Sequence, residues 1–197
     1  MATTRDNKTI SNFKAALIGG GARPNLFEVE LPTLPDAVTG WDADIFRFMC
    51  KAAQLPPQNI ASIDIPFRGR IFKVAGDRTI DPWTVTVIND EDFTLRTAFE
   101  NWTQQIADLS TNLGATDPSA YMTNAKVFQL GRGSSKASQD SSGDSNVVLK
   151  EYEFIDIFPT SVSAIDLSYD TGDTIEEFTV EFQVQSLNLA GAGSPNG

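Results

Sequence analysis

The stretch that decides the fold is GRIFKVAGDRTIDPWTVTVINDEDFTLRTAFENW, residues 69–102. Residues 71–74 are a short β-prone run, and residues 75–78 predict a turn because Gly76 adopts positive φ without steric cost. Apolar residues then alternate with threonines, in the order Trp83, Thr84, Val85, Thr86 and Val87. This period of two predicts a strand with one buried face.

The pattern changes from strand to helix after residue 88. Asn89 is a candidate N-cap, and Asp92 stands three residues later, where a capping box places its acidic partner. Large apolar residues follow at spacings of three and four, namely Leu95, Phe99, Trp102, Ile106 and Leu109. Such spacing predicts an amphipathic helix whose apolar stripe lies on another element.

The strand period recurs along the chain. One-faced alternation or β-prone composition marks residues 24–31, 45–52, 60–67, 125–130, 147–157, 162–169 and 178–187. Short one-sided strands with one amphipathic helix predict a mainly β (α+β) fold, with two packed antiparallel sheets forming a β-sandwich or small barrel beside the helix. We expect six of the large residues to be structural core: Trp83, Val85, Phe99, Trp102, Phe178 and Phe182.

Several uninterrupted blocks resemble the tail tube proteins of T4-like contractile-tailed bacteriophages (the myovirus and cyanophage type). The resemblance covers roughly residues 22–184 in the order of that family. The blocks are ARPNLFEVEL (22–31), CKAAQLP (50–56), AGDRT (75–79), WTVTVINDE (83–91), EYEFIDIFPTSVSAIDLSYD (151–170) and EEFTVEF (176–182).

The resemblance implies a structural virion protein. In that family, subunits form hexameric rings that stack into an inner tube, and inner-sheet strands of all copies line one channel. The implied partners are further copies of the chain, a tail sheath protein, a tape-measure protein, and baseplate and tail-terminator proteins. Double-stranded DNA would pass through the channel without specific binding. The implied location is the contractile tail of the virion, after assembly in the host cytoplasm.

The resemblance also implies a domain organisation. We expect a flexible N-terminal arm over residues 1–21, a single tail-tube domain over residues 22–188, and a flexible C-terminal tail over residues 189–197. Residues 32–44 and 131–146 are expected to be surface insertions, because the family pattern is shorter there. Trp41 lies in the first of these segments and is a candidate contact residue of a loop.

Charge is unevenly distributed. The net charge is −11; residues 1–75 carry nine basic and seven acidic side chains, and residues 76–197 carry six basic and nineteen acidic ones. Such a chain should not hold nucleic acid tightly, because Lys and Arg contacts with phosphate supply most of that affinity. Charge alone leaves two interpretations open, solubility or a surface that DNA passes without adhering.

The most basic segment is the predicted hairpin around residue 69. We expect it and the N-terminal arm to make contacts within or between rings. The interface residues predicted on this basis are Phe13, Leu17, Arg68, Arg70, Lys73, Asp77 and Arg78. An electrostatic contact with the acidic part of another copy explains this segment better than nucleic-acid binding, because it has no aromatic stacking platform.

The sequence argues against catalysis and against a cofactor or metal. It contains no His and one cysteine, Cys50, so it lacks the commonest general base and a zinc cluster. The paired carboxylates Glu151/Glu153 and Glu176/Glu177 are expected to be solvated surface. Three alternatives remain: the tube of a related contractile injection or secretion system, a carbohydrate-binding β-sandwich, and a carboxylate hydrolase.

Cellular context follows from two further absences in the sequence. The N-terminus is too polar for a signal peptide, and no apolar run approaches the roughly 20 residues of a membrane span. Cys50 within an apolar run is expected to be a buried thiol in a reducing compartment. We therefore expect no membrane insertion.

Overall fold

The computed structural model describes residues 9–17, 21–35, 38–55, 57–132, 146–170 and 172–188. The predicted insertion at residues 131–146 and the predicted tail at residues 189–197 lie almost wholly outside these ranges, as does most of the predicted N-terminal arm. The chain divides into two compact units, one of Met1–Glu28, Phe128–Glu151 and Ala190–Gly197, the other of Val29–Val127 and Tyr152–Leu189. The predicted domain limits at residues 22 and 188 stay predictions.

The fold is mainly β, as the sequence predicted. Seven strands form one sheet in the order β1-β6-β7-β8-β5-β2, with β9 paired to β7. They are β1 (Phe27–Glu30), β2 (Cys50–Ala53), β5 (Trp83–Ile88), β6 (Thr123–Arg132), β7 (Asn146–Val162), β8 (Glu177–Gln183) and β9 (Ser186–Asn188). The order begins at β1 and ends at β2, so hydrogen bonding does not close a barrel within the described residues.

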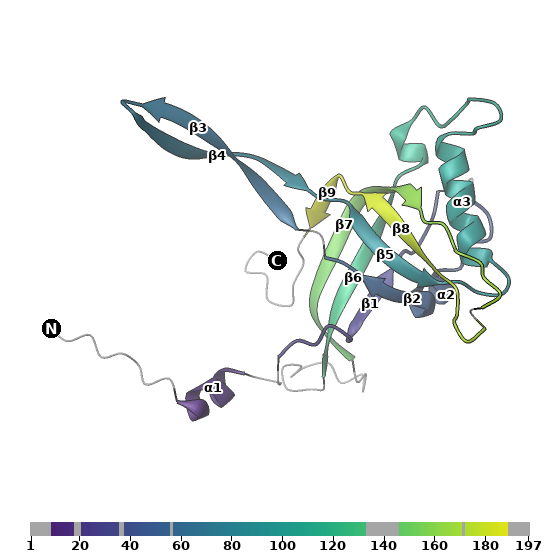
Figure 1. The fold of residues 1–197 in the computed structure, drawn as a ribbon, viewed down its shortest axis with the longest axis horizontal. Helices are drawn as coiled ribbons and strands as arrows, with labels where there is room; N and C mark the ends of the chain where they lie inside the picture. Colours follow the sequence, from purple (N-terminus) through teal and green to yellow (C-terminus); the bar gives the residue numbers. More distant parts are fainter. Residues whose placement is uncertain are drawn as a thin grey trace. The chain divides into compact units, whose positions relative to one another are not determined.

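The second sheet is a two-stranded hairpin of β3 (Gln58–Phe67) and β4 (Arg70–Ile80). Figure 1 shows it extending away from the larger sheet. The turn predicted at residues 75–78 is wrong, because β4 continues through it. The chain instead reverses at Arg68 and Gly69, whose φ angles are 45° and 82°. Two consecutive positive φ values suit a tight hairpin turn, and Gly69 adopts this conformation without steric strain.

The core lies where β5 and β8 face the helix α3 (Thr94–Ile106). The antiparallel register pairs Trp83 with Phe182, Val85 with Val180 and Val87 with Phe178, and all six side chains are buried. From α3, Leu95, Ala98, Phe99 and Trp102 are buried as well. The ring of Phe99 lies 6.1 Å from that of Phe178 and 5.9 Å from that of Phe182. The helix therefore packs across the β5–β8 face, visible at the right of Figure 1.

The predicted start and end of the long helix are wrong. The helix begins at Thr94 after Phe93 in the left-handed conformation, and Asp90 Oδ2 accepts a hydrogen bond from the Thr94 amide at 3.3 Å. Asn89 does not cap it: its backbone nitrogen and its Nδ2 donate to Glu176, and its Oδ1 accepts no hydrogen bond within the described residues. The helix ends at Ile106, which leaves Leu109 93% exposed and outside the apolar stripe.

The strand predicted at residues 45–52 is also wrong. Residues Ala43–Met49 form helix α2, and only Cys50–Ala53 are extended. The carboxylate of Asp42 accepts hydrogen bonds from the amides of Asp44 and Ile45, which is the N-cap signal that favours a helix here. Phe46 is consequently buried, whereas Phe48 is 79% exposed.

Two smaller expectations also change. Trp41 is not a free loop contact: its indole nitrogen donates to the Leu31 carbonyl, and its ring lies 5.1 Å from Phe46 and 5.5 Å from Phe99. The strand predicted at residues 162–169 is absent, because β7 ends at Val162 and the following segment is irregular. That irregular segment is one of the candidate assembly surfaces.

Candidate assembly surfaces

The β3–β4 hairpin leaves a whole apolar face uncovered. Its register pairs Ile63 with Val74 and Ile65 with Phe72, and paired residues of antiparallel strands share a face. That face, here called the hairpin apolar face, consists of Ile63, Ile65, Phe67, Phe72 and Val74. Their side chains are between 39% and 65% exposed. Contiguous apolar surface of this kind marks an interaction site in a folded protein.

The opposite face of the hairpin, here called the polar face, carries a charged pair together with Ile71, which is paired with Pro66 and is also exposed. Asp64 is paired with Lys73, and Lys73 Nζ lies 2.9 Å from Asp64 Oδ1. Nearer the sheet, Arg78 donates a hydrogen bond to Gln58 across the two strands. One face of the hairpin is thus apolar and the other is mixed, and both are exposed.

The hairpin tip is basic. Arg68 lies over the ring of Phe67, 5.4 Å from its centroid, and Arg70 is paired with Phe67 across the turn. Five of the seven interface residues predicted from sequence lie on this hairpin, and all five are exposed: Arg68, Arg70, Lys73, Asp77 and Arg78. Both acidic residues of β3 and β4, Asp64 and Asp77, lie farther from the turn than the two tip arginines.

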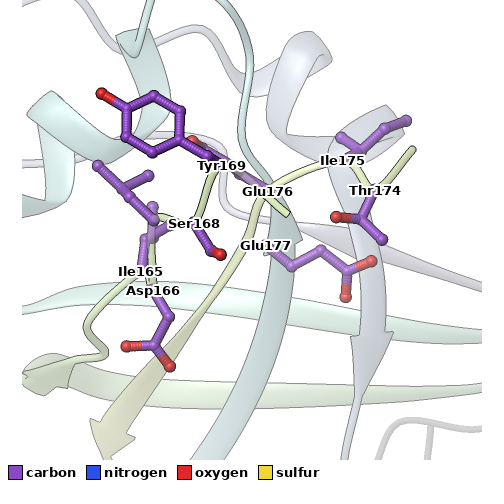
Figure 2. A pocket seen from close by; sticks show the side chains of 9 residues that line it. Ile165, Asp166, Ser168, Tyr169, Thr174, Ile175, Glu176 and Glu177 are labelled. Atoms are coloured by element: carbon purple, nitrogen blue, oxygen red, sulfur yellow. The ribbon is translucent and has the colours of Figure 1, made fainter. Parts of the chain in front are cut away.

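A second exposed surface lies between β7 and β8. It is an open pocket of about 560 Å³ lined by Ile165, Asp166, Leu167, Ser168, Tyr169, Thr174, Ile175, Glu176 and Glu177. We call it the acidic groove. Leu167 is 80% exposed, Tyr169 108% and Ile175 71%. In Figure 2, Tyr169 and Ile175 lie along the upper side of the view and the carboxylates of Asp166 and Glu177 along the lower side.

The chain segment that forms the acidic groove is negatively charged. Residues 163–177 contain five carboxylates, Asp166, Asp170, Asp173, Glu176 and Glu177, and no Lys or Arg. Glu177 forms a salt bridge with Lys51 of the neighbouring edge strand, and Glu176 accepts from the Asn89 side chain at 3.0 Å. The groove thus combines exposed apolar side chains with negative charge.

Both ends of the groove segment are fixed to the core. The Ser163 amide donates to the Thr179 carbonyl, and the Thr179 amide donates to Ser163 Oγ, each at 2.8 Å. Arg96 of α3 donates to the Ser163 carbonyl at 2.8 Å and lies over the ring of Phe178. At the other end, the Asn89 amide donates to the Glu176 carbonyl at 2.9 Å. These bonds hold the groove against the end of strand β5.

The hairpin and the acidic groove lie at opposite ends of β5. Strand β4 ends at Ile80 and β5 begins at Trp83, so the hairpin leaves from the Trp83 end. At the other end Ile88 pairs with Glu177, a residue of the groove. Six residues of strand separate the two ends by roughly 17 Å.

A third exposed apolar surface belongs to the smaller unit. Helix α1 (Ile10–Ala16) begins at Thr9, whose hydroxyl accepts a hydrogen bond from the Asn12 amide. Ile10, Phe13 and Leu17 are 73%, 63% and 45% exposed. The spacing places these three on one side of the helix. Phe13 and Leu17 are the two remaining interface residues predicted from sequence.

Other chemistry-bearing side chains are engaged in local contacts. Glu153 accepts a hydrogen bond from the Asn188 side chain, and Glu177 is paired with Lys51. Burial raises the pKa of the Cys50 thiol to about 12, against a smaller opposing effect of a hydrogen bond with the backbone of Ala52. Within the described residues, no group of three or more metal-ligating side chains comes together, and no helix has the length and apolarity to span a membrane.

Solved structures with a similar fold include chains of contractile injection systems. The tube-terminating cap of the anti-feeding prophage superposes with a TM-score of 0.59 at 16% identity, over 98% of this chain and 100% of that one. A chain of the sheath–tube complex of an extracellular contractile injection system, in its extended state, gives a TM-score of 0.59 at 11% identity, over 94% and 100% of the two chains. These likenesses show that this chain shares its fold with chains of those two assemblies.

Sequence comparison is more specific. A profile of the phage tail tube protein family matches residues 22–189. The chain is 36% identical to tail tube protein gp19 of Enterobacteria phage T4 over 162 residues, which is 82% of this chain and 88% of that protein. The corresponding protein of Enterobacteria phage T6 is 35% identical over the same share. The chain belongs to the phage tail tube protein family.

The sequence signals that identified the hairpin did not identify the acidic groove. The charges of the hairpin and its Arg-Gly-Arg turn are visible in the sequence, but the alternation Ile165, Leu167 and Tyr169 looks like a buried strand face. The carboxylates interleaved there were the available signal. Residues 163–177 combine five acids with no base, which is more charge than a core strand usually carries.

Proposed function

We propose that this protein assembles into hexameric rings that stack into the inner tube of a contractile phage tail. The observation that carries the proposal is the hairpin apolar face, which no described residue of the larger unit covers. An isolated two-stranded hairpin is marginally stable in water, so a hairpin of this length needs a partner surface. Family membership supports another copy of the chain as that partner.

A ring requires a contact between different surfaces of neighbouring copies. Such a heterologous contact closes into a ring when the rotation between copies is right. The sheet offers two terminal strands, β1 and β2, for pairing between chains. The charged hairpin residues and the exposed α1 residues Phe13 and Leu17 would contribute further contacts within or between rings.

The charge of the chain supports passage of DNA rather than binding. A net charge of −11 gives an assembled tube a strongly negative field, which repels phosphates instead of holding them. We propose that double-stranded DNA crosses the channel without specific contacts. The tube would work inside a sheath, around a tape-measure protein, between a baseplate and a terminator, in a virion assembled in the host cytoplasm.

The experiment compares two pairs of substitutions on the same hairpin. Ile65→Ser with Phe72→Ser removes a cross-strand pair from the hairpin apolar face, and Asp64→Ser with Lys73→Ser removes the pair beside it on the polar face. Negative-stain microscopy should show rings or tubes for the wild type and the polar-face variant only. Loss of the exposed salt bridge costs at most about 1 kcal/mol, so that variant is the matched control.

Two results would contradict the proposal. One is a wild-type protein that stays monomeric at millimolar concentration, and the other is a variant lacking the apolar pair that assembles normally. A carbohydrate-binding module would instead be a monomer that binds glycans. A tube from a bacterial contractile injection system would form similar rings, and its sheath partner would distinguish it from a phage tail.

A further inference from the structure

We propose that the hairpin tip of one copy docks in the acidic groove of the next. The tip consists of Phe67, Arg68, Arg70 and Phe72, and the groove is the surface lined by residues 165–169 and 174–177. This inference rests on the proposed assembly, because it names the surface of the second copy that receives the hairpin.

The two surfaces have complementary chemistry. The tip presents two exposed aromatic rings and two arginines, and the groove presents Leu167, Tyr169 and Ile175 beside carboxylates. Arg68 and Arg70 make no salt bridge within the described part of the chain, and neither does Asp166. An arginine guanidinium forms bidentate hydrogen bonds with carboxylates and stacks on aromatic rings. Asp166 offers the first kind of contact and Tyr169 the second.

The places of the tip and the groove on the chain allow the contact to repeat from copy to copy. The tip extends from the Trp83 end of β5, and the groove lies at the Ile88 end of the same strand. Because β5 holds them apart, the tip and the groove of one copy cannot meet. Docking therefore joins two copies head to tail, and an open row of copies keeps a free tip at one end and a free groove at the other. A heterologous contact of this type repeats through a ring or along a stack.

The groove segment is anchored at both ends. The bonds of Ser163 with Thr179 and of Glu176 with Asn89 tie these ends to the core, and such anchoring lowers the conformational entropy that remains to be lost on binding. The exposed rings of Phe67 and Phe72 would supply the anchors, because buried aromatic residues dominate contact energies.

The experiment is disulfide trapping between copies. Phe67→Cys and Tyr169→Cys each replace an exposed residue, and the native Cys50 is buried and resistant to oxidation. A mixture of the two single variants should give a disulfide-linked dimer after mild oxidation, and the double variant should give a ladder of multimers. Leu109→Cys, also on an exposed residue, mixed with Phe67→Cys should give no crosslink.

A charge exchange tests the same contact without cysteines. Arg68→Glu with Arg70→Glu should raise the protein concentration needed for assembly at least about tenfold, because like charges would meet in the groove. Adding Asp166→Lys, which reverses a carboxylate that lines the groove, should recover part of that loss. An unrestored assembly in the variant with all three substitutions would overturn the docking.

The outcomes separate this inference from the proposed function. Tubes that form with no crosslink between positions 67 and 169, or in which the thiol of the Tyr169→Cys variant remains as reactive to maleimide as in the monomer, would overturn the docking and leave the tube intact. A protein that forms no assembly at all would overturn both. Disulfide-linked multimers that form only when cysteines stand at positions 67 and 169 would support the docking.

Discussion

The indole ring of Trp83 stacks on the phenyl ring of Phe154, with centroids 4.5 Å apart and planes inclined by 14°. The same indole lies 5.3 Å from the ring of Phe182. Both of its neighbours are fully buried. Trp83 therefore contacts β7 and β8 from β5, close to the strand end from which the hairpin extends, and the core at that end supports the hairpin.

Truncation of Trp83 should destabilise the fold severely. Trp83→Ala should lower the free energy of unfolding by about 3–5 kcal/mol, because it removes a buried aromatic side chain and leaves a cavity. Trp83→Phe should cost less, since the indole nitrogen has no hydrogen-bond partner to lose. Urea denaturation of both variants in the assembly-deficient Ile65→Ser, Phe72→Ser background measures this. A cost below about 1 kcal/mol for the alanine variant would contradict the packing.

Arg96 should contribute more to the stability of the fold than its salt bridge with Glu100 does. It donates to the Ser163 carbonyl and lies over Phe178, in addition to its pairing with Glu100 at 2.8 Å. Arg96→Ala should cost about 1–3 kcal/mol, because the charged hydrogen bond and the ring contact are both lost. Glu100→Gln removes only the exposed ion pair and should cost at most about 0.5 kcal/mol. Equal effects in urea denaturation would show that the Ser163 contact contributes nothing.

Cys50 should be inert in the folded protein. With its pKa raised to about 12, its thiolate fraction at pH 8 is about a thousandfold below that of a thiol at the ordinary value of 9.0. Reaction with an aromatic disulfide reagent should accelerate by at least that factor in denaturant. The unfolded thiol ionises first as the pH rises, so stability should fall above about pH 9. Rapid native labelling would contradict its burial.

Asp108 should titrate at unusually low pH. Its carboxylate accepts hydrogen bonds from the Ser110 amide and from the Thr111 and Ser110 hydroxyls, and these lower its pKa from 3.8 to about 2. Because the folded pKa is the lower one, the stability linked to Asp108 is present above about pH 4 and is lost as the pH falls towards 2. A carboxyl-carbon NMR titration with a midpoint near 3.8 would show that these bonds do not form.

The core was predictable because its signals are local. The alternation around Val85 and the spacing of Phe99 and Trp102 specify a strand face and a helix face directly, and these residues are buried in the structure. Long-range contacts set the details that could not be predicted. Asn89 bonds to Glu176, which is 87 residues away, and the helix starts only at Thr94, after Phe93 in the left-handed conformation.

The candidate surfaces were predictable only in part. The basic hairpin was visible in the sequence, but the uncovered state of its apolar face was not, because alternating isoleucines in residues 60–67 resemble a core strand. The same ambiguity hid the acidic groove. An alternation of apolar residues predicts which residues share a face of a strand. It does not predict whether that face packs against the same chain or against another copy.

The central claim is that a second copy covers the hairpin apolar face. Cryo-electron microscopy of the assembled protein tests it most directly, because the density shows what lies against Ile65 and Phe72. The account predicts rings with a central channel in which another copy buries both side chains. Assemblies in which the β3–β4 hairpin projects into solvent, with these two residues as exposed as in the single chain, would contradict it.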